Sequence, residues 1–354
     1  MLRLVEILLK SARIVIYYAL LAGLLFTMVM PFVEAYQKPD ANLANGALFW
    51  SLFAQNFLVA AFLFEFLFIL VTHQSLLRAS IVRIFAYSSN RETDLYYWMY
   101  FTAVYFFLPI WISQSPYLKS IFPIYDLGSI AGGLFGFLLL SWVAYAVHWL
   151  SHNVPALWEL HKIHHSTTEL TGITGPREHL FFEIIHIGVF ILFFDTSYML
   201  ASLVFASRAF LNVLQHSQLS MKFGWLGNFV ISPHAHRIHH LKNPKYFNKN
   251  FGSDITLWDH LFGTFQYEVP LTAAEMEKDF GLSEQDNPGG EKYVFHELGI
   301  TTYRSLKVLF RDLISVGSRM SGNYKALSPK LDTLPSSSDH QEAPSAASKI
   351  PLNP

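Results

Sequence analysis

The histidines of this chain gather in three short clusters whose spacing fits a helix. Of 16 histidines, all but those at positions 73, 296 and 340 lie between His148 and His260. Residues three or four positions apart share one face of a helix, so we expect the imidazoles of each cluster to point in one direction. The clusters read HWLSH, HKIHH and HRIHH, and they comprise His148 and His152, then His161, His164 and His165, then His236, His239 and His240.

The repeated pattern predicts a site for two metal ions. A catalytic zinc ion takes about three protein ligands, so the eight clustered imidazoles exceed what one ion can bind. Imidazole suits iron, copper, zinc or nickel. Iron that activates O₂ fits a nitrogen-rich site beside a membrane best, although the ligand count does not exclude zinc. His216, in the sequence QHS, is a further candidate ligand. Structural roles are favoured for His179, His186, His234 and His260.

Carboxylates near the clusters could accept imidazole N–H protons and fix the orientation of the rings. A solvated surface role is an equal alternative for each of them. They are Glu159, Glu178, Glu183, Asp254 and Asp259. The chain has no cysteine, which excludes thiolate ligands, disulfides and cysteine nucleophiles. Its net charge near −1 gives no basic field that would attract nucleic acid, so no nucleic-acid partner is expected.

The composition is typical of a membrane protein. The chain is 52% hydrophobic and 14% charged, whereas soluble domains average about 25% charged residues. Four apolar stretches precede the histidines, at 14–33, 47–72, 96–113 and 127–147, and roughly 20 apolar residues cross a bilayer. The stretch at 180–214 is too short for two spans, which need about 40 residues. We therefore expect a hairpin there that dips into the membrane and returns.

The placement of basic residues orients the spans. They precede the first span and separate the second from the third, whereas the opposite loops contain only Lys38 and Lys119. By the positive-inside rule, the catalytic histidines face the cytoplasm, and the polar segment 216–310 is expected to be cytoplasmic. The sequence thus predicts an all-α, multi-pass membrane helical bundle, with about four spans plus the hairpin, under a histidine-rich di-metal cap.

The same features divide the chain into regions. We expect an N-terminal transmembrane region over 1–125 and a catalytic domain over 126–270. A cytoplasmic helical extension follows over 271–327. The last segment, 328–354, is rich in Ser, Pro and Ala and has no large apolar cluster, a composition that predicts a disordered tail.

A family resemblance rests on the histidine clusters and two further elements. The run HWLSHNVPALWELHKIHHS is followed by SPHAHRIHH and then by FNKNFGSDITLWDHLFGTF. This order resembles the fatty acid hydroxylase/sterol desaturase superfamily, whose pattern is HxxxH, HxxHH and HxxHH with an N-[YF]-G element and a W-D-x-x-F-G-T ending. The TGITGPREH stretch and the segment NPKYFNKNFG look most similar to the alkylglycerol monooxygenase branch. The resemblance covers roughly residues 125–270.

What the resemblance implies is a non-haem di-iron enzyme that uses O₂ to hydroxylate or desaturate a membrane lipid. The lipid could be a sterol, a fatty acyl chain or an ether lipid. The eight clustered histidines would be iron ligands, and His216 would join them. Electrons would come from a separate redox protein or, as the alkylglycerol monooxygenase branch implies, from a tetrahydropterin. The residues that would frame the site are Asn250, Gly252, Asp254, Trp258 and Asp259.

Two other classes stay open on the residues alone. A membrane metal-binding or transport protein would need polar side chains along its spans, and these spans offer little beyond Glu65. A zinc-dependent lipid hydrolase would need an open metal position and a nearby general base. The identity of the bound metal and the dependence of turnover on O₂ distinguish these classes from an oxygenase.

Overall fold

The computed structural model of the chain describes residues 65–71, 77–114, 125–126, 130–195, 210–282 and 294–320, with short runs at 8, 11–12, 14–16, 18–19 and 208. Within these ranges the chain is helical, as predicted. Its strands there are a parallel pair of two residues each, β1 (Tyr125–Asp126) and β2 (Phe194–Asp195). The chain divides into two units, residues 1–308 and 309–354, and the site described below lies in the first.

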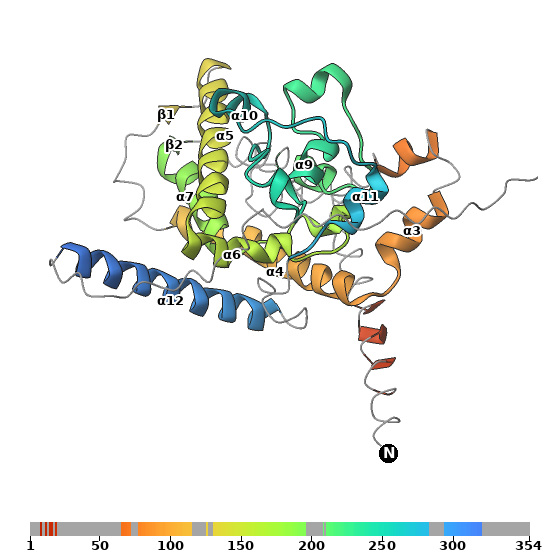
Figure 1. Ribbon diagram of the computed structural model, residues 1–354, viewed down its shortest axis with the longest axis horizontal. Helices are drawn as coiled ribbons and strands as arrows, with labels where there is room; N and C mark the ends of the chain where they lie inside the picture. The colour runs from red at the N-terminus through yellow and green to blue at the C-terminus, as the bar shows by residue number, and fades with distance from the viewer. Residues whose placement is uncertain are drawn as a thin grey trace, which may run out of the picture. The chain divides into compact units, whose positions relative to one another are not determined.

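The helices are labelled in Figure 1. They are α3 (Leu77–Phe85), α4 (Ser89–Gln114), α5 (Ile130–Asn153), α6 (Pro155–His165), α7 (Leu180–Phe193), α9 (Pro233–His239), α10 (Leu257–Phe262), α11 (Ala273–Lys278) and α12 (Val294–Met320). Three short 3₁₀ helices lie between them, namely η3 (Gly172–Thr174), η4 (Gly224–Asn228) and η5 (Pro244–Tyr246).

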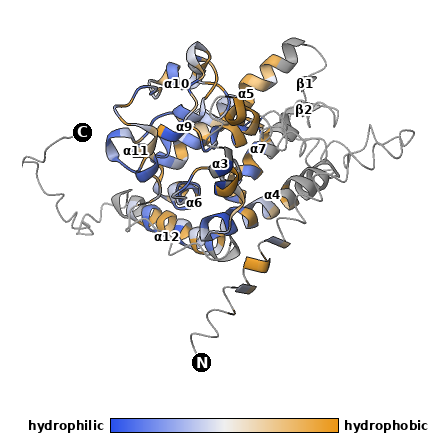
Figure 2. Ribbon diagram, turned by 90° about the vertical axis from the view of Figure 1, so that its right-hand side faces the viewer, coloured by the Kyte–Doolittle hydropathy of each residue, from blue (hydrophilic) through white to orange (hydrophobic). Residues whose placement is uncertain are grey.

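Helix α5 contains most of the fourth predicted apolar stretch and continues past it through the first histidine cluster. Its segment Leu134–Asn153 is long and apolar enough to cross a membrane, and it is the one such helix in the part of the chain that the structure describes. Figure 2 shows α5 mostly in the colour of hydrophobic residues. The third predicted stretch, 96–113, lies inside α4.

Other predicted segments lie wholly or largely outside the described residues. These are the stretches 14–33 and 47–72, the second half of the 180–214 hairpin, and the tail 328–354. Helix α7 occupies the first part of that hairpin segment.

A proline separates α5 from α6 and turns the second histidine cluster toward the first. Val154 is extended and Pro155 is the first residue of α6. Proline is preorganised for the first turn of a helix and disfavours helical backbone in the residue before it. The two helices then pack against each other, which brings HWLSH and HKIHH together.

Two clusters of buried apolar side chains hold the other elements around α6 and α9. Tyr97 and Phe101 of α4 pack on Ile163 of α6. Helix α9 begins at a proline, and its cap is Ser232, whose Oγ accepts a hydrogen bond from the Ala235 N–H at 3.2 Å. A second cluster joins α9 to η5, to α11 and to the loop after α6, and consists of Leu170, Ile238, Leu241, Tyr246, Met276 and Phe280.

Candidate metal centre

The structure brings the nine histidines singled out in the sequence into two adjacent groups. Within each group, one ring nitrogen from every residue lies within 4.8 Å of all the others. The first group comprises His148, His152, His161, His165 and His239, and the second comprises His164, His216, His236 and His240.

Each HxxHH cluster is divided between the two groups. In α6, the histidines four residues apart, His161 and His165, enter the first group, while His164 enters the second. In the third cluster, His236 and His240 enter the second group and His239 the first. The expectation that each cluster points all its imidazoles in one direction therefore holds only for the pairs four residues apart.

Four of the imidazoles are anchored through Nδ1 to a backbone carbonyl oxygen. A carbonyl oxygen can only accept a hydrogen bond, so each Nδ1 carries the proton and the Nε2 of the same ring is left with a lone pair. The pairs are His148 with Phe251 O at 2.9 Å, His164 with Arg177 O at 3.1 Å, His216 with Asn212 O at 2.7 Å, and His239 with Lys249 O at 2.7 Å.

Several Nε2 atoms meet with their lone pairs facing one another or without a hydrogen-bond partner. His164 and His216 place their Nε2 atoms 3.3 Å apart, and both nitrogens bear lone pairs because both protons sit on Nδ1. The buried Nε2 atoms of His148, His161 and His239 have no hydrogen-bond partner. Buried polar groups are rarely left unpaired, and neutral imidazole nitrogens are common metal ligands. The donor set therefore fits two metal ions, one in each group.

Burial keeps these ligands in the form that binds metal. Desolvation lowers the pKa of His216 to about 4. It also holds the pKa values of six further histidines well below 6.5, and repulsion between neighbouring imidazoles adds to the effect for each. They are His161, His164, His165, His236, His239 and His240. A ligating imidazole must be neutral, so burial in the folded chain keeps these rings in the protonation state that binds metal.

Glu178 is the carboxylate that reaches the histidines. Its Oε2 lies 3.3 Å from Nδ1 of His161 and 3.9 Å from Nδ1 of His164. Burial raises the pKa of Glu178, and a hydrogen bond from the His179 N–H at 3.1 Å partly offsets that effect. Carboxylates in this position orient metal-bound imidazoles and increase their basicity. From the sequence, Glu178 is only one of several acids near the histidines.

Comparison with known proteins identifies the segment that carries this centre. Residues 133–264 match the fatty acid hydroxylase family, and this range contains all nine histidines. These residues form a fatty acid hydroxylase domain.

Lipid-modifying oxygenases are among the similar proteins. The chain is 32% identical to the ornithine lipid hydroxylase OlsE of Rhizobium tropici over 133 residues, which are 37% of this chain and 40% of that protein. It is 26% identical to human alkylglycerol monooxygenase over 186 residues, 51% of this chain and 36% of that protein. It is 29% identical to human cholesterol 25-hydroxylase over 146 residues, 38% and 50% of the two chains.

These matches confirm the predicted resemblance to the superfamily and to its alkylglycerol monooxygenase-like members. The chain spans half or less of the length of each of these three relatives. No solved structure matches the chain.

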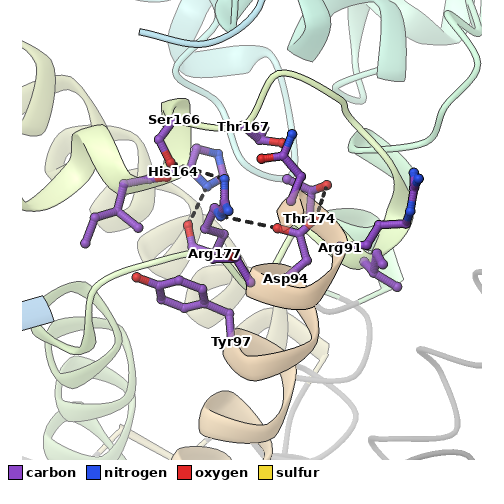
Figure 3. A network of polar contacts seen from close by, with 12 residues as sticks. Arg91, Asp94, Tyr97, His164, Ser166, Thr167, Thr174 and Arg177 are labelled. Carbon is purple, nitrogen blue, oxygen red and sulfur yellow. Dashed lines mark hydrogen bonds and ion pairs between the residues drawn. The ribbon is translucent and has the colours of Figure 1, made fainter. Parts of the chain in front are cut away.

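A buried ion pair between the hydroxylase domain and helix α4 supports the loop that anchors His164. Arg177, whose carbonyl oxygen accepts from His164, directs its Nε toward Asp94 of α4 at 3.2 Å. Thr174 Oγ1 donates to Asp94 at 3.3 Å, and Arg177 Nη1 donates to Ser166 Oγ at 3.2 Å. Figure 3 shows this network, in which α4 is tied to the loop beside the second histidine cluster. The sequence singled out neither member of the pair: Asp94 has no motif around it, and Arg177 lies in the TGITGPREH stretch, which served only for the family resemblance.

The W-D-x-x-F-G-T element of the hydroxylase domain anchors His148 indirectly. Asp259 accepts hydrogen bonds from the N–H groups of Phe251 and Gly252, both at 2.8 Å, and from Thr264 Oγ1 at 2.7 Å. These bonds fix the Phe251 carbonyl against His148. A Cβ on Gly252 would lie 2.5 Å from the Ile255 carbonyl oxygen and 2.7 Å from Asp259, so only glycine fits there.

Asn250 fastens the same turn of the hydroxylase domain to α9. It adopts a positive φ of 56°, which asparagine tolerates better than most residues. Its side-chain amide donates to the Ala235 carbonyl at 2.8 Å, and its side-chain oxygen accepts from the Gln266 N–H at 2.8 Å. Trp258 donates from Nε1 to Ser141 of α5 at 3.1 Å.

Two other carboxylates considered in the sequence point toward cations instead of imidazoles. Glu159 pairs with Lys162 at 2.6 Å, and Asp254 pairs with Arg208 at 2.6 Å. Four histidines for which a structural role is expected stay outside both groups, and these are His179, His186, His234 and His260. His234, for example, uses both ring nitrogens, with Ser220 Oγ at 2.8 Å and the Tyr267 carbonyl at 2.9 Å.

Proposed function

We propose that the chain is a membrane-bound, non-haem di-iron oxygenase that uses O₂ to hydroxylate a lipid. The observation that supports this most is the convergence of nine imidazoles in two groups. Four of them donate from Nδ1 to a backbone carbonyl and so leave a lone pair on Nε2. The relatives named above are hydroxylases and monooxygenases acting on ornithine lipid, alkylglycerol and cholesterol. Two ions held by nitrogen ligands, beside a lipid phase, suit oxidation of an unactivated C–H bond.

The reaction needs a reductant as well as O₂. Hydroxylation converts a C–H bond to C–OH with one oxygen atom, while the other atom leaves as water after taking up two electrons and two protons. Iron bound by the two groups would supply the O₂ activation and the electron transfer. The chain's own residues hold the imidazoles neutral, fix their tautomers through backbone carbonyls, and keep the ring of His161 against Glu178. A tetrahydropterin or a separate redox protein would supply the electrons.

The substrate is a membrane lipid, namely a sterol, a fatty acyl chain or an ether lipid. Helix α5 supports this because the segment that could cross a membrane ends at the first histidine cluster. A lipid in the bilayer beside α5 would need to move only along the helix to reach His148.

We further propose a multi-pass topology with the histidines on the cytoplasmic face, on the basis of the basic residues near the N-terminus and before α4. Desaturation would follow from a different placement of the same substrate.

Metal analysis and oxygen labelling test the proposal. Protein purified into lipid nanodiscs should contain about two irons per chain, as the two groups imply, and should incorporate one atom of ¹⁸O₂ into a lipid extracted from its own host membrane. His239→Ala should abolish incorporation while membrane insertion is kept. His260→Gln is the matched control, because His260 is exposed and lies outside both groups. Zinc as the native metal, with turnover that does not need O₂, would overturn the proposal.

A further inference from the structure

The hydroxylase domain exposes a set of large apolar side chains on two segments, residues 224–230 and 255–263. Trp225 is 72% exposed, Leu261 64% and Phe229 61%. Neither segment contains lysine, arginine or glutamate, and the sole aspartate in them, Asp259, is buried. We call this set the apolar patch, which consists of Trp225, Leu226, Phe229, Leu257, Leu261 and Phe262.

The two segments of the apolar patch form one unit whose backbone polar groups are paired. Val230 and Ile255 form an antiparallel bridge. Thr256 donates from its N–H to the Phe229 carbonyl at 3.0 Å and from its hydroxyl to the Asn228 carbonyl at 2.6 Å. The Asn228 carbonyl also accepts from Nε2 of His260 at 3.1 Å. Non-helical backbone can enter hydrocarbon only where the protein satisfies its hydrogen bonds, and these contacts satisfy the carbonyls of Asn228 and Phe229 and the N–H of Thr256.

The apolar patch is tied to the side of α5, well before the end of that helix. Trp258 bonds to Ser141, as described above, and Tyr145 bonds to Thr264 at 3.0 Å. The ring of Phe262 stacks on Tyr145 with a centroid distance of 5.4 Å. Ser141 precedes His148 by seven residues, which is about 10 Å along a helix. Figure 1 shows α10 beside α5.

The neighbouring surface of α5 is also apolar and exposed. Its outward side chains there are Leu134, Phe135, Leu138 and Trp142. All four lie in the segment that is apolar enough to cross a membrane. The apolar patch therefore adjoins the one helix, among the residues that the structure describes, that is long and apolar enough to cross a membrane.

We propose that the apolar patch is immersed in the bilayer beside α5 and contacts lipid acyl chains. This inference rests on the proposed membrane location of α5, and it differs from the sequence expectation that 216–310 is wholly cytoplasmic. The exposed ion pair of Lys222 and Glu268, 3.0 Å apart, marks the polar edge of this region. Trp225, three residues beyond Lys222, occupies a position typical of the interfacial aromatic belt.

A bilayer explains this surface better than a second copy of the chain does. Patch and helix together form an apolar surface beside a candidate span, and none of the exposed residues named in it is charged. Exposed apolar patches of this extent on soluble surfaces promote association, whereas the same residues beside a span are covered by lipid without a partner. The immersed unit would place the turn that anchors His148 directly at the lipid boundary, because Phe251 of that turn packs edge-on against Tyr145.

The natural absence of cysteine allows a direct depth measurement. Single variants Leu261→Cys in the patch, Leu138→Cys on α5 and Glu268→Cys at the polar edge would each carry a nitroxide label. The full chain would be reconstituted in vesicles of phosphatidylcholine and phosphatidylglycerol. Collision rates with O₂, which concentrates in lipid, and with a water-soluble nickel chelate report the depth of each label. Iron content matching that of the parent chain would show that each variant is folded.

The outcomes separate this inference from the proposed membrane location. We expect the labels at 261 and 138 to favour O₂ and the label at 268 to favour nickel by several-fold. A lipid-buried label at 138 with a water-exposed label at 261 would overturn immersion of the patch alone. Water exposure at both positions would overturn the membrane location of α5 and the inference with it. Strong spin–spin broadening at 261 that disappears on dilution with unlabelled chain would show a second copy on the patch, which also overturns the inference.

Discussion

His164 and His165 are adjacent in the sequence, yet their imidazoles belong to different histidine groups. Their ring centroids lie 5.5 Å apart and the ring planes meet at 77°. Successive residues of a helix differ by about 100° in direction, so the last two histidines of HKIHH face two different centres. His239 and His240 are divided in the same way. Each HxxHH motif therefore connects the two proposed metal positions.

This division predicts unequal effects of two neighbouring substitutions. His164→Ala leaves three histidines in its group, whereas His165→Ala leaves four in the other. Because the group that contains His164 starts with fewer histidines, we expect His164→Ala to lose more metal and more oxygenase activity than His165→Ala. His165→Ala should retain more metal and measurable activity. Mass spectrometry of the metal bound to each purified variant measures which variant loses more. Equal loss of both ions in both variants would contradict the assignment of His164 and His165 to different groups.

The sequence was sufficient to predict which histidines gather, but not how they divide. Clustering follows from helical spacing, which is local, and the nine predicted histidines do converge. The helical step separates neighbouring histidines, but which ring of each motif joins which group depends on how α6 and α9 are placed, and α6 is placed in part by the contacts of Ile163 with Tyr97 and Phe101 of α4. No local pattern encodes that placement.

The residues that hold the histidines in position were harder to predict than the histidines themselves. Asp94 and Arg177 are 83 positions apart (177 minus 94) and form an ion pair inside the protein. From the sequence, Asp94 stands at the polar start of an apolar helix, where a solvated residue is the ordinary expectation. Glu159 and Asp254 were equally reasonable candidates beside the clusters, but each is paired with a cation. Proximity in sequence is a poor guide to which carboxylate meets an imidazole.

Glu178→Gln should weaken metal binding without unfolding the chain. The substitution keeps the size of the side chain and replaces the carboxyl group that faces Nδ1 of His161 with an amide. Loss of such an outer partner typically lowers metal affinity or activity by about 10–100-fold. Titration of the metal-depleted protein with Fe²⁺ under anaerobic conditions measures the affinity. Glu169→Gln is a matched control, because Glu169 is partly exposed and pairs with Arg91 away from the histidines, and an equal effect in both variants would exclude the role given to Glu178.

Gly252→Ala should disturb the centre through the anchor of His148. The added Cβ would clash with the Ile255 carbonyl oxygen and the Asp259 carboxylate. The carboxylate is held in place because it accepts three hydrogen bonds in the same turn. We expect destabilisation of roughly 1–3 kcal/mol, as for overpacking in a core, together with reduced iron content.

Gly299→Ala in α12 is the control, because a Cβ at that position meets no atom within 4 Å. Thermal unfolding followed by tryptophan fluorescence, with metal analysis on the same samples, measures both quantities. Unchanged stability and iron content in Gly252→Ala would contradict this prediction, because the turn would then have accommodated the added Cβ without disturbing the anchor of His148.

The metal-free protein should lose stability as the pH falls through the range where free histidine titrates. Burial lowers the pKa values of the histidines in both groups, and the pKa of His216 falls to about 4. Below about pH 6.5 the unfolded chain binds protons on these imidazoles, whereas the folded chain does not. The unfolded state then holds more protons, so the free energy of unfolding decreases as the pH decreases. Each such histidine contributes a slope of up to about 1.4 kcal/mol per pH unit.

Melting temperatures of the chelator-treated protein between pH 7.5 and 5.5 would reveal this slope. His240→Ala removes one of the buried imidazoles, so its melting temperature should depend less steeply on pH than that of the parent chain. A melting temperature that stays constant or rises on acidification would mean that the histidines accept protons in the folded state, and the neutral ligand set described here would then be wrong.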